Sequence, residues 1–358
     1  MYRWLQQIFS GKTASKTSAP PVSTFAPPAP PATPGTSGTP AIVSAPAPQL
    51  AFEQRDTIDT AYLHWLFDSS TVGLDTSPAE NSVLAATGAI LSSQQSGAAL
   101  VRRLPGLVPQ LLQSLRSDDF SAAQLSRLIS TDVVLVAAII RVANGLYVGT
   151  GTQITSVEHA VILIGQEGLR QLITSVAFRP IIDINSGHYT RTLAPRIWDQ
   201  SERCAVAGRA VAEARGFDPF DAFLAGLVQN VGLIVTLRIM DGVAKDGAGK
   251  HGHSLGSEVF TARLMADARA LTCSICREWK FPDSVIAAIT EQGGVRKGAS
   301  VSPLGRVLTV ADYLSKMRLL ADADRIADDD PTLIAGLPDG ARACYLSLSA
   351  LGAAPGPA

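Results

Sequence analysis

The feature that most constrains this chain is an almost wholly apolar stretch, Phe223 to Leu237, with two adjacent neutral amides at its middle. As a helix it would be apolar on nearly every side, so it should run through a core rather than along a surface. Gln229 and Asn230 would then need partners, because a buried amide without hydrogen bonds costs about 1–3 kcal/mol. Two interpretations stay open: amides satisfied within the core, or the remains of an active site.

Composition favours an all-α fold. Hydrophobic residues make up 46% of the 358 residues, mostly Ala, Leu, Val and Ile, and aromatic residues only 6%. A net charge of −1 gives no electrostatic footprint for nucleic acid, so no nucleic-acid partner is expected. The longest uninterrupted apolar run, Val133 to Ile140, is far shorter than the roughly 20 residues of a membrane span, so we expect no transmembrane segment. Four cysteines in so long a chain suit a reducing cytoplasm.

The first fifty residues cannot contribute a core. Residues 1–12 form a short amphipathic segment, either a frayed end or a docking segment for a membrane surface or a partner groove. Residues 13–50 are rich in Ala, Pro, Ser and Thr and predict a disordered linker, because they cannot bury enough apolar surface to offset chain entropy. Such a segment supplies reach, and it can also serve as a polyproline ligand.

A helical extension over residues 51–100 is expected to pack on the main domain. Apolar spacing predicts one helix from Asp56 to Phe67, capped by Asp56 or Thr57, and a second from Glu80 to Leu91.

The main domain, residues 101–320, begins with capped helices and carries no strand signal as far as residue 178. Ser121 and Gln124 form a capping box, and helices are expected from Val133 to Asn144 and from Ser156 to Ile164. The helix pair around Thr131 could suggest a DNA-reading helix-turn-helix, but its second helix is apolar where a recognition helix is polar. Residues 321–358 should form a solvated acidic loop and a C-terminal tail with one last helical turn, Leu346 to Leu351.

Several motifs, in order and spacing, resemble the HDOD domain, an all-helical domain of bacterial signalling proteins related to HD-type metal phosphohydrolases. They are Leu104-Pro105, Leu128 to Asp132, Ile140 to Gly149, Ile154 to Gly165, Ile197 to Ser201, Phe223 to Leu227, Trp279 to Pro282 and Val310-Ala311-Asp312. The resemblance covers Leu104 to Met317. It implies an HD-like helical domain behind a disordered Ala/Pro-rich N-terminal segment.

The resemblance also implies where metal ligands would lie. HD enzymes hold metal ions through several His residues, a His-Asp pair and a late Asp. The bound metal lowers the pKa of its water and polarises a phosphoryl oxygen. In this chain the His positions fall on Gln200, Ala268, Gln292 and Gly293, the His-Asp pair on Gln229 and Asn230, and the late Asp on Asp312. Only Asp312 keeps a ligand type. We therefore expect no metal, no cofactor and no catalytic residue, but a degenerate pocket of Gln200, Gln229, Asn230, Gln292 and Asp312. Glu291 and Asp267 could in principle rebuild a site.

Other candidate motifs are weak. Cys273 and Cys276 lie in a helical run without a second ligand pair, so a buried role is expected. His251 and His253 lie in a Gly- and Lys-rich loop, where solvated side chains are expected. P-loop, dinucleotide-binding and nucleophile-elbow motifs are absent from the sequence.

The leading hypothesis is a non-catalytic bacterial signal-transduction or regulatory scaffold in the cytoplasm, a pseudoenzyme whose HDOD-like body binds a protein partner. One alternative is a metal-dependent phosphohydrolase with a rebuilt site. Another is a nucleotide or cyclic-dinucleotide sensor without hydrolysis, since an inactive pocket can keep its shape.

Overall fold

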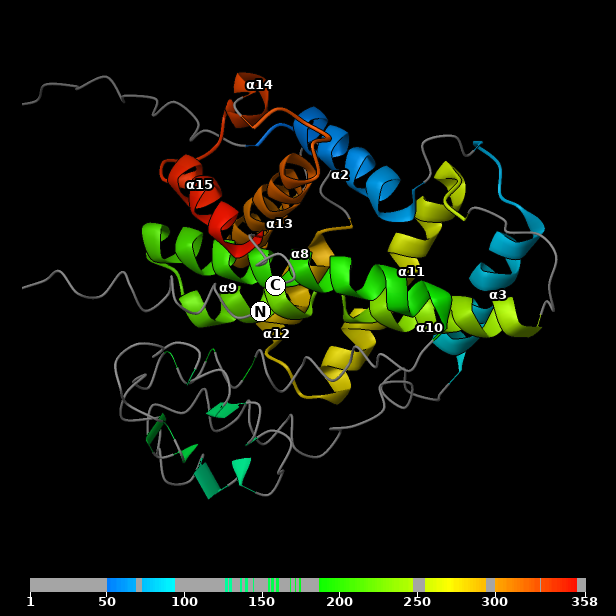
Figure 1. Cartoon of the computed structure of the whole chain (residues 1–358), viewed down its shortest axis with the longest axis horizontal. Coiled ribbons are helices and arrows are strands. Elements are labelled where there is room, and N and C mark those ends of the chain that lie inside the picture. Colours follow the sequence, from blue (N-terminus) through cyan, green and yellow to red (C-terminus); the bar gives the residue numbers. More distant parts are fainter. Residues whose placement is uncertain are drawn as a thin grey trace, which may run out of the picture.

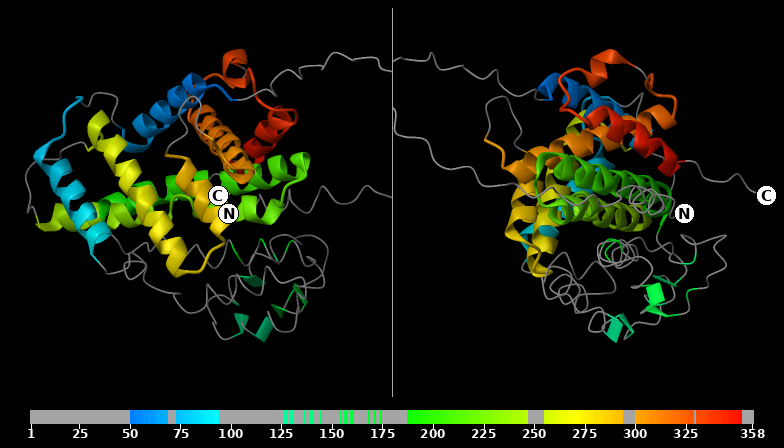
Figure 2. Two further views of the ribbon diagram at one scale, coloured as in Figure 1. Left: turned by 180° about the vertical axis from the view of Figure 1, so that it is seen from behind. Right: turned by 90° about the vertical axis from the view of Figure 1, so that its left-hand side faces the viewer.

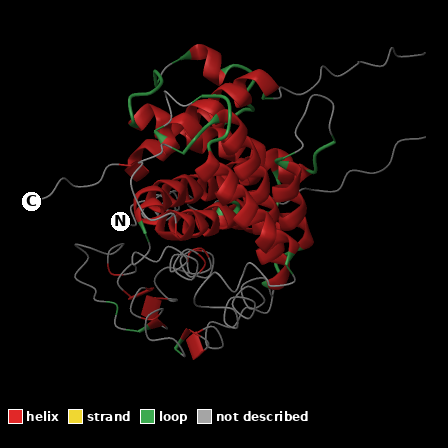
Figure 3. Cartoon of the chain, turned by 90° about the vertical axis from the view of Figure 1, so that its right-hand side faces the viewer, coloured by secondary structure: helices red, strands yellow, loops and turns green. Residues whose placement is uncertain are grey.

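The computed structural model describes residues 50–68, 73–93, 187–246, 255–293, 300–328 and 330–352, together with isolated residues between 126 and 174. Within these ranges the elements are helices and no strand occurs, which confirms the all-α prediction (Figure 3). The helices are α2 (Phe52–Phe67), α3 (Pro78–Ser92), α8 (His188–Arg215), α9 (Pro219–Val228), α10 (Val231–Asp246), α11 (Glu258–Glu278), α12 (Asp283–Glu291), α13 (Pro303–Asp322), α14 (Pro331–Ile334) and α15 (Ala341–Gly352).

Helix α8 forms the centre of the molecule and packs against α9, α10, α13 and α15 (Figure 1). Its first turn is capped from α10, because the Asp241 carboxylate accepts hydrogen bonds from the backbone N–H groups of Tyr189 (2.8 Å) and Thr190 (3.1 Å). Its last turn ends at Gly216, whose φ of 70° is the left-handed conformation that favours glycine. This central helix carries Gln200, one of the residues of the candidate site.

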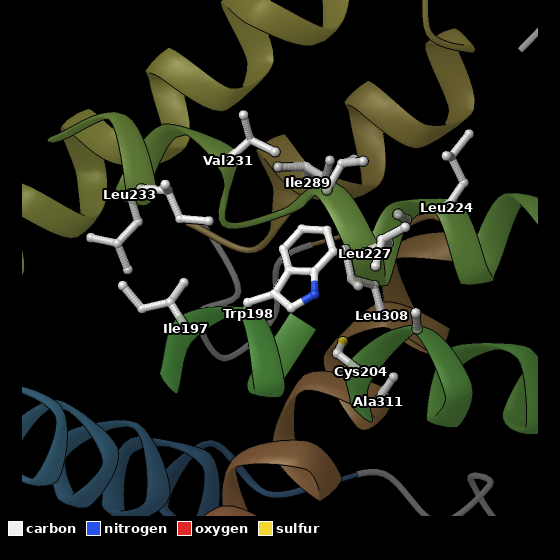
Figure 4. Packing of buried hydrophobic residues seen from close by; sticks show 14 of the residues in the cluster. Ile197, Trp198, Cys204, Leu224, Leu227, Val231, Leu233, Ile289, Leu308 and Ala311 are labelled. Carbon is white, nitrogen blue, oxygen red and sulfur yellow. The ribbon is translucent and has the colours of Figure 1, made fainter. Parts of the chain in front are cut away.

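The core around α8 is aliphatic and closely packed. Trp198 of α8 lies among apolar side chains of α9 and α12, and Cys204 lies beside Ala311 of α13 (Figure 4). Glycine permits a close helix contact here: a Cβ on Gly226 of α9 would lie 2.7 Å from the backbone nitrogen of Ala205 in α8. A side chain at this position would therefore push α8 and α9 apart.

The stretch Phe223 to Leu237 is buried as predicted, but it forms two helices rather than one. The chain breaks at the amide pair, where Gln229 caps the end of α9 and α10 begins at Val231. Thr272 of α11 holds the break: its hydroxyl donates to the Gln229 carbonyl (3.1 Å) and accepts from Gly232 N–H (2.9 Å). Apolar periodicity could not reveal this break, since the backbone groups it frees are satisfied by a distant helix.

By length and composition alone, the stretch Pro219–Lys245 could cross a membrane, which the sequence reading did not anticipate. However, 78% of its most apolar window is buried inside the protein. It is therefore best described as the core of the helical body.

The helical extension starts earlier than predicted. Helix α2 begins at Phe52, not Asp56, because the Gln54 side chain accepts from the backbone N–H of Ala51 (3.3 Å) and closes the first turn. Helix α3 begins at Pro78, with Ser77 as its N-cap, two residues before the predicted start. Figure 2 shows α2 lying over α13, against which it packs, while α3 packs against α10 and α11.

The C-terminal acidic segment is not simply solvated, as the sequence reading had it. Asp322 accepts from Arg203 (2.5 Å) and Arg318 (2.8 Å), and Asp328 accepts from Arg318 (2.6 Å) and the Tyr345 hydroxyl (2.5 Å). The tail forms α14 and a full helix α15 rather than one last turn. The i,i+4 pair of Arg318 and Asp322 is visible in local spacing, whereas the pairing of Asp322 with Arg203 joins residues distant in sequence and could not be predicted from it.

Several predictions lie outside the described residues: the segment 1–12, the linker 13–49, most of the helices expected between 101 and 178, and the loop with His251 and His253.

Candidate functional site

Three of the predicted pocket residues form one hydrogen-bonded cluster with Asp312. Gln200 Nε2 of α8 donates to Asp312 Oδ1 (2.9 Å), and Gln229 Nε2 donates to the same oxygen (3.1 Å). Asn230 Nδ2 donates to Gln200 Oε1 and to Ser201 Oγ (3.0 Å). The break between α9 and α10 thus places two amides against α8 and α13, and all three amides donate inside the cluster.

The second carboxylate oxygen of Asp312 binds a lysine that sequence reasoning did not single out. Lys316 Nζ, one turn along α13, donates to Asp312 Oδ2 (2.6 Å) and to Asp59 Oδ1 of α2 (2.6 Å). Burial opposes charge on this ammonium, but the two carboxylates outweigh it and raise the pKa of Lys316 above its ordinary value. A fixed positive charge therefore lies between two carboxylates.

A cavity of about 130 Å³ lies beside this cluster. Four of the predicted pocket residues line this cavity: Gln229, Asn230, Gln292 and Asp312. Gln200 does not line it but donates to Asp312. The other residues that line the cavity are Arg55, Asp59, Leu63, Leu233, Met265, Ala268, Arg269, Ile289 and Lys316. Helices α2, α11, α12 and α13 and the α9–α10 break meet there. The structure thus brings together all five residues of the predicted degenerate pocket.

Gln292, at the far wall, is satisfied by backbone and hydroxyl groups. Its Nε2 donates to the carbonyls of Ala288 (2.9 Å) and Gly305 (3.1 Å), and its Oε1 accepts from Thr309 Oγ1 (3.0 Å). Its backbone carbonyl accepts from Arg55 Nη2 (3.1 Å). Gln292 therefore fixes the end of α12 instead of offering a free donor to the cavity.

The donor set does not fit a transition metal. Asp312 has both oxygens engaged, the neighbouring groups are amides, and a lysine ammonium occupies the space between the carboxylates. In the described part of the chain, no group of three or more His, Cys, Asp or Glu side chains could hold a metal ion. Loss of one supporting group alone typically weakens metal binding about 10- to 100-fold, so replacement of nearly every ligand should abolish tight binding.

The two acids considered for a rebuilt site do not line the cavity. Glu291 accepts from the backbone N–H (3.1 Å) and hydroxyl (2.7 Å) of Ser302, at the start of α13. Asp267 lies on α11 beside Arg263, and partial burial raises the pKa of its carboxyl. The structure gives neither acid a place beside Asp312.

The cysteine pair has the buried role that the sequence predicted. Cys273 and Cys276 are both buried and unpaired, and Cys273 Sγ lies 3.3 Å from Thr290 Oγ1. Burial raises the pKa of the Cys276 thiol. These thiols are poor candidates for nucleophiles.

The charged residues of the cavity were missed by the search for family ligands. Arg55 with Asp59, and Asp312 with Lys316, each have the i,i+4 spacing of an ion pair on one helix face, which is a signal visible in the sequence. Arg269 carried no such signal. What local spacing could not show is that α2 and α13 pack together, so that Lys316 bridges two carboxylates.

Sequence comparison identifies the class of protein. The HDOD domain family matches residues 101–294, more than half of the chain, so the chain belongs to the HDOD domain family. An uncharacterized protein of Treponema pallidum (strain Nichols) is 23% identical over 137 residues, 38% of this chain. The match covers 26% of that protein's length, so this chain spans about a quarter of the relative it matches.

Solved structures with the same fold come from several bacteria. A protein from Shewanella amazonensis SB2B, provisionally assigned as a phosphohydrolase, has a TM-score of 0.53 at 20% identity, covering 75% of this chain and 96% of its own. An HDOD domain protein of unknown function from Geobacter sulfurreducens has a TM-score of 0.51 at 17% identity, covering 76% and 92%. A protein from Marinobacter aquaeolei VT8, provisionally assigned to signal transduction, has a TM-score of 0.51 at 19% identity, covering 79% and 65%. At these identities the likeness establishes the fold alone.

Proposed function

We propose that this HDOD protein is a non-catalytic regulatory component of a bacterial cytoplasmic signalling pathway, whose helical body binds a protein partner. The observation that carries the proposal is Lys316, whose ammonium binds Asp312 and Asp59 at the centre of the degenerate site. A metal hydrolase needs a cation with an open position for water or substrate. A lysine ammonium offers neither Lewis acidity nor an open coordination position.

The surrounding amides support the same conclusion. Gln200, Gln229 and Asn230 keep the hydrogen-bonding capacity of a polar site but supply no charge and no imidazole. Gln200 and Gln229 donate to Asp312, and Asn230 donates to the carbonyl oxygen of Gln200, so these donors are used within the protein as in a structural polar network. Asp59 and Lys316 lie outside the matched residues 101–294, so flanking helices complete the cluster. A helical domain that has the family's fold but, in its described part, no metal site is suited to binding a protein partner rather than to hydrolysis.

Elemental analysis tests the proposal. Full-length protein purified without chelator should carry well under one Mn, Fe or Zn per chain, and it should not hydrolyse a panel of phosphomonoesters, nucleotides and cyclic dinucleotides. The double variant Gln229→His/Asn230→Asp serves as a control: it should also stay inactive, because Gln200 and Gln292 still supply no imidazole. One tightly held transition metal per wild-type chain, or metal-dependent hydrolysis by the wild type, would overturn the proposal.

A further inference from the structure

One cationic side chain at the cavity has no counter-ion within the described residues. The Arg269 guanidinium of α11 lines the cavity, yet no carboxylate of the described chain pairs with it. Other partly buried cations of the core do have carboxylate partners, such as Arg203 with Asp322 and Lys316 with Asp312. Burying an unpaired charge is costly, so an exception at a cavity wall calls for a function.

A second guanidinium faces the same cavity from α2. Arg55 donates from Nη2 to the Gln292 carbonyl (3.1 Å), and its Nε lies 3.5 Å from Asp59 Oδ2. The Nε itself is buried and makes no hydrogen bond. Burial, and then repulsion by Arg55, lower the pKa of Arg269 below its ordinary value, and the weaker attraction of Asp312 and Asp59 does not offset them. Two like charges are thus close enough to oppose each other across one space.

The chain accommodates this arrangement at Gly293. A Cβ on Gly293 would lie 2.5 Å from Arg269 Nη1, so the guanidinium packs over the backbone where α12 ends. The two carboxylates at the cavity, Asp59 and Asp312, are already bound by Lys316. Three cationic side chains therefore share the cavity with two carboxylates, and the excess positive charge lies at the arginines.

We propose that this cavity binds a tetrahedral oxyanion, either free phosphate or the phosphate group of a small ligand, between Arg55 and Arg269. The guanidinium fork matches phosphate oxygens, and an anion between the two arginines would turn their repulsion into attraction. The volume of about 130 Å³ is well below the roughly 300–1,000 Å³ of pockets for drug-sized ligands, so the enclosed part of the ligand is small. This inference rests on the proposed function only in that the cavity holds no metal.

Binding would also have a structural consequence. Arg55 lies on α2, which follows the N-terminal segment, whereas Arg269 lies on α11 of the main body. An anion held by both side chains would tighten the docking of α2. Binding would then stabilise the contact between α2 and the rest of the described body, without any hydrolysis.

The test measures anion binding to the full chain. Isothermal titration calorimetry and thermal melts would compare inorganic phosphate with adenosine monophosphate as a phosphate ester, at constant ionic strength, in wild type and in Arg269→Gln. Loss of a charge-assisted contact should weaken phosphate binding roughly 10- to 100-fold. Arg263→Gln is the matched control, because Arg263 lies on the same helix with an exposed side chain, and it should bind as wild type does.

A stability readout separates a binding role from a structural one. Without ligand, Arg269→Gln should melt at or above the temperature of wild type, because the substitution removes a buried charge and its repulsion with Arg55. Binding of either probe that is lost in Arg269→Gln supports the proposal, and the stronger binder identifies the source of the phosphate. Absence of binding by both probes at millimolar concentration, or binding that Arg269→Gln leaves unchanged, would overturn it. Because metal content is measured separately, failure here leaves the proposed function standing.

Discussion

Replacing Lys316 by Met tests the central ion pair of the site. The side chain of Lys316 is 11% exposed and that of Asp312 is 9% exposed, so the pair is mostly shielded from water, whereas Asp59 is 31% exposed. Methionine keeps the apolar stem of lysine and removes only the charge. The variant should then leave Asp312 and Asp59 without the ammonium that joins them, although Arg55 stays 3.5 Å from Asp59.

The expected cost follows from the burial of these carboxylates. Removing one partner of a buried ion pair typically costs about 3–5 kcal/mol, because the remaining charge is left unpaired. The partial exposure of Asp59 lets water screen its charge, so we expect a value near the lower end, about 3 kcal/mol. That corresponds to a fall in melting temperature of roughly 6–12 °C for a body of this size. Exposed Lys245, changed to Met, should show almost no effect and serves as the control.

The pH dependence has a definite sign. The pKa of Lys316 is raised in the folded protein, so the stabilisation by this pair is fully present below the pKa of an unfolded lysine, about 10.4. It is lost as the pH rises through the folded pKa. From pH 7 to 9 the difference between wild type and Lys316→Met should therefore stay constant.

Urea unfolding followed by circular dichroism gives the free energies. The double variant Lys316→Met/Asp312→Asn should cost less than the sum of the two single variants, with a coupling of about 1–3 kcal/mol. A cost below 1 kcal/mol for Lys316→Met, or additive single effects, would show that the lysine does not neutralise these carboxylates.

The remaining predictions concern packing and the amide cluster. Gly226→Ala should lower the free energy of unfolding by about 1–3 kcal/mol in urea, because the new Cβ would clash with the backbone at Ala205. An unchanged free energy of unfolding would contradict that contact. Gly88→Ala should instead stabilise the protein by about 0.5–1 kcal/mol, because Gly88 lies in the interior of α3 and a Cβ there would have no atom within 4 Å. A loss of stability would refute this. Asn230→Ala should cost about 1–3 kcal/mol, because Gln200 loses a donor to its buried carbonyl oxygen; an unchanged melting temperature would show that the amide serves only the cavity.

Sequence reasoning located the fold and the family because both depend on local periodicity and on motif order. It also named five pocket residues from the order of the HDOD motifs; four of them line one cavity, and the fifth, Gln200, donates to Asp312 beside it. It missed the break at Gln229, because the partner that satisfies this break, Thr272, is distant in sequence. It read the acids of the C-terminal segment as solvated for a related reason: Arg203, which binds Asp322, lies on the distant helix α8, although the i,i+4 spacing of Arg318 and Asp322 was visible.

The contacts around Asp312 support the proposal that the adjoining cavity binds a ligand. The cluster around Asp312 has become self-sufficient: amides saturate one oxygen and Lys316 the other. A core that evolved only for stability would be expected to fill the adjoining space with apolar side chains and to pair its cations. Instead, Arg269 lines this space without a carboxylate partner among the described residues, and Arg55, which pairs with Asp59, lines it too; charged groups in such a setting are typical of functional sites. The self-contained cluster at Asp312 and Arg269, unpaired within the described residues, are therefore separate observations: the first supports the proposed absence of catalysis, and the second supports the proposed binding of an anion.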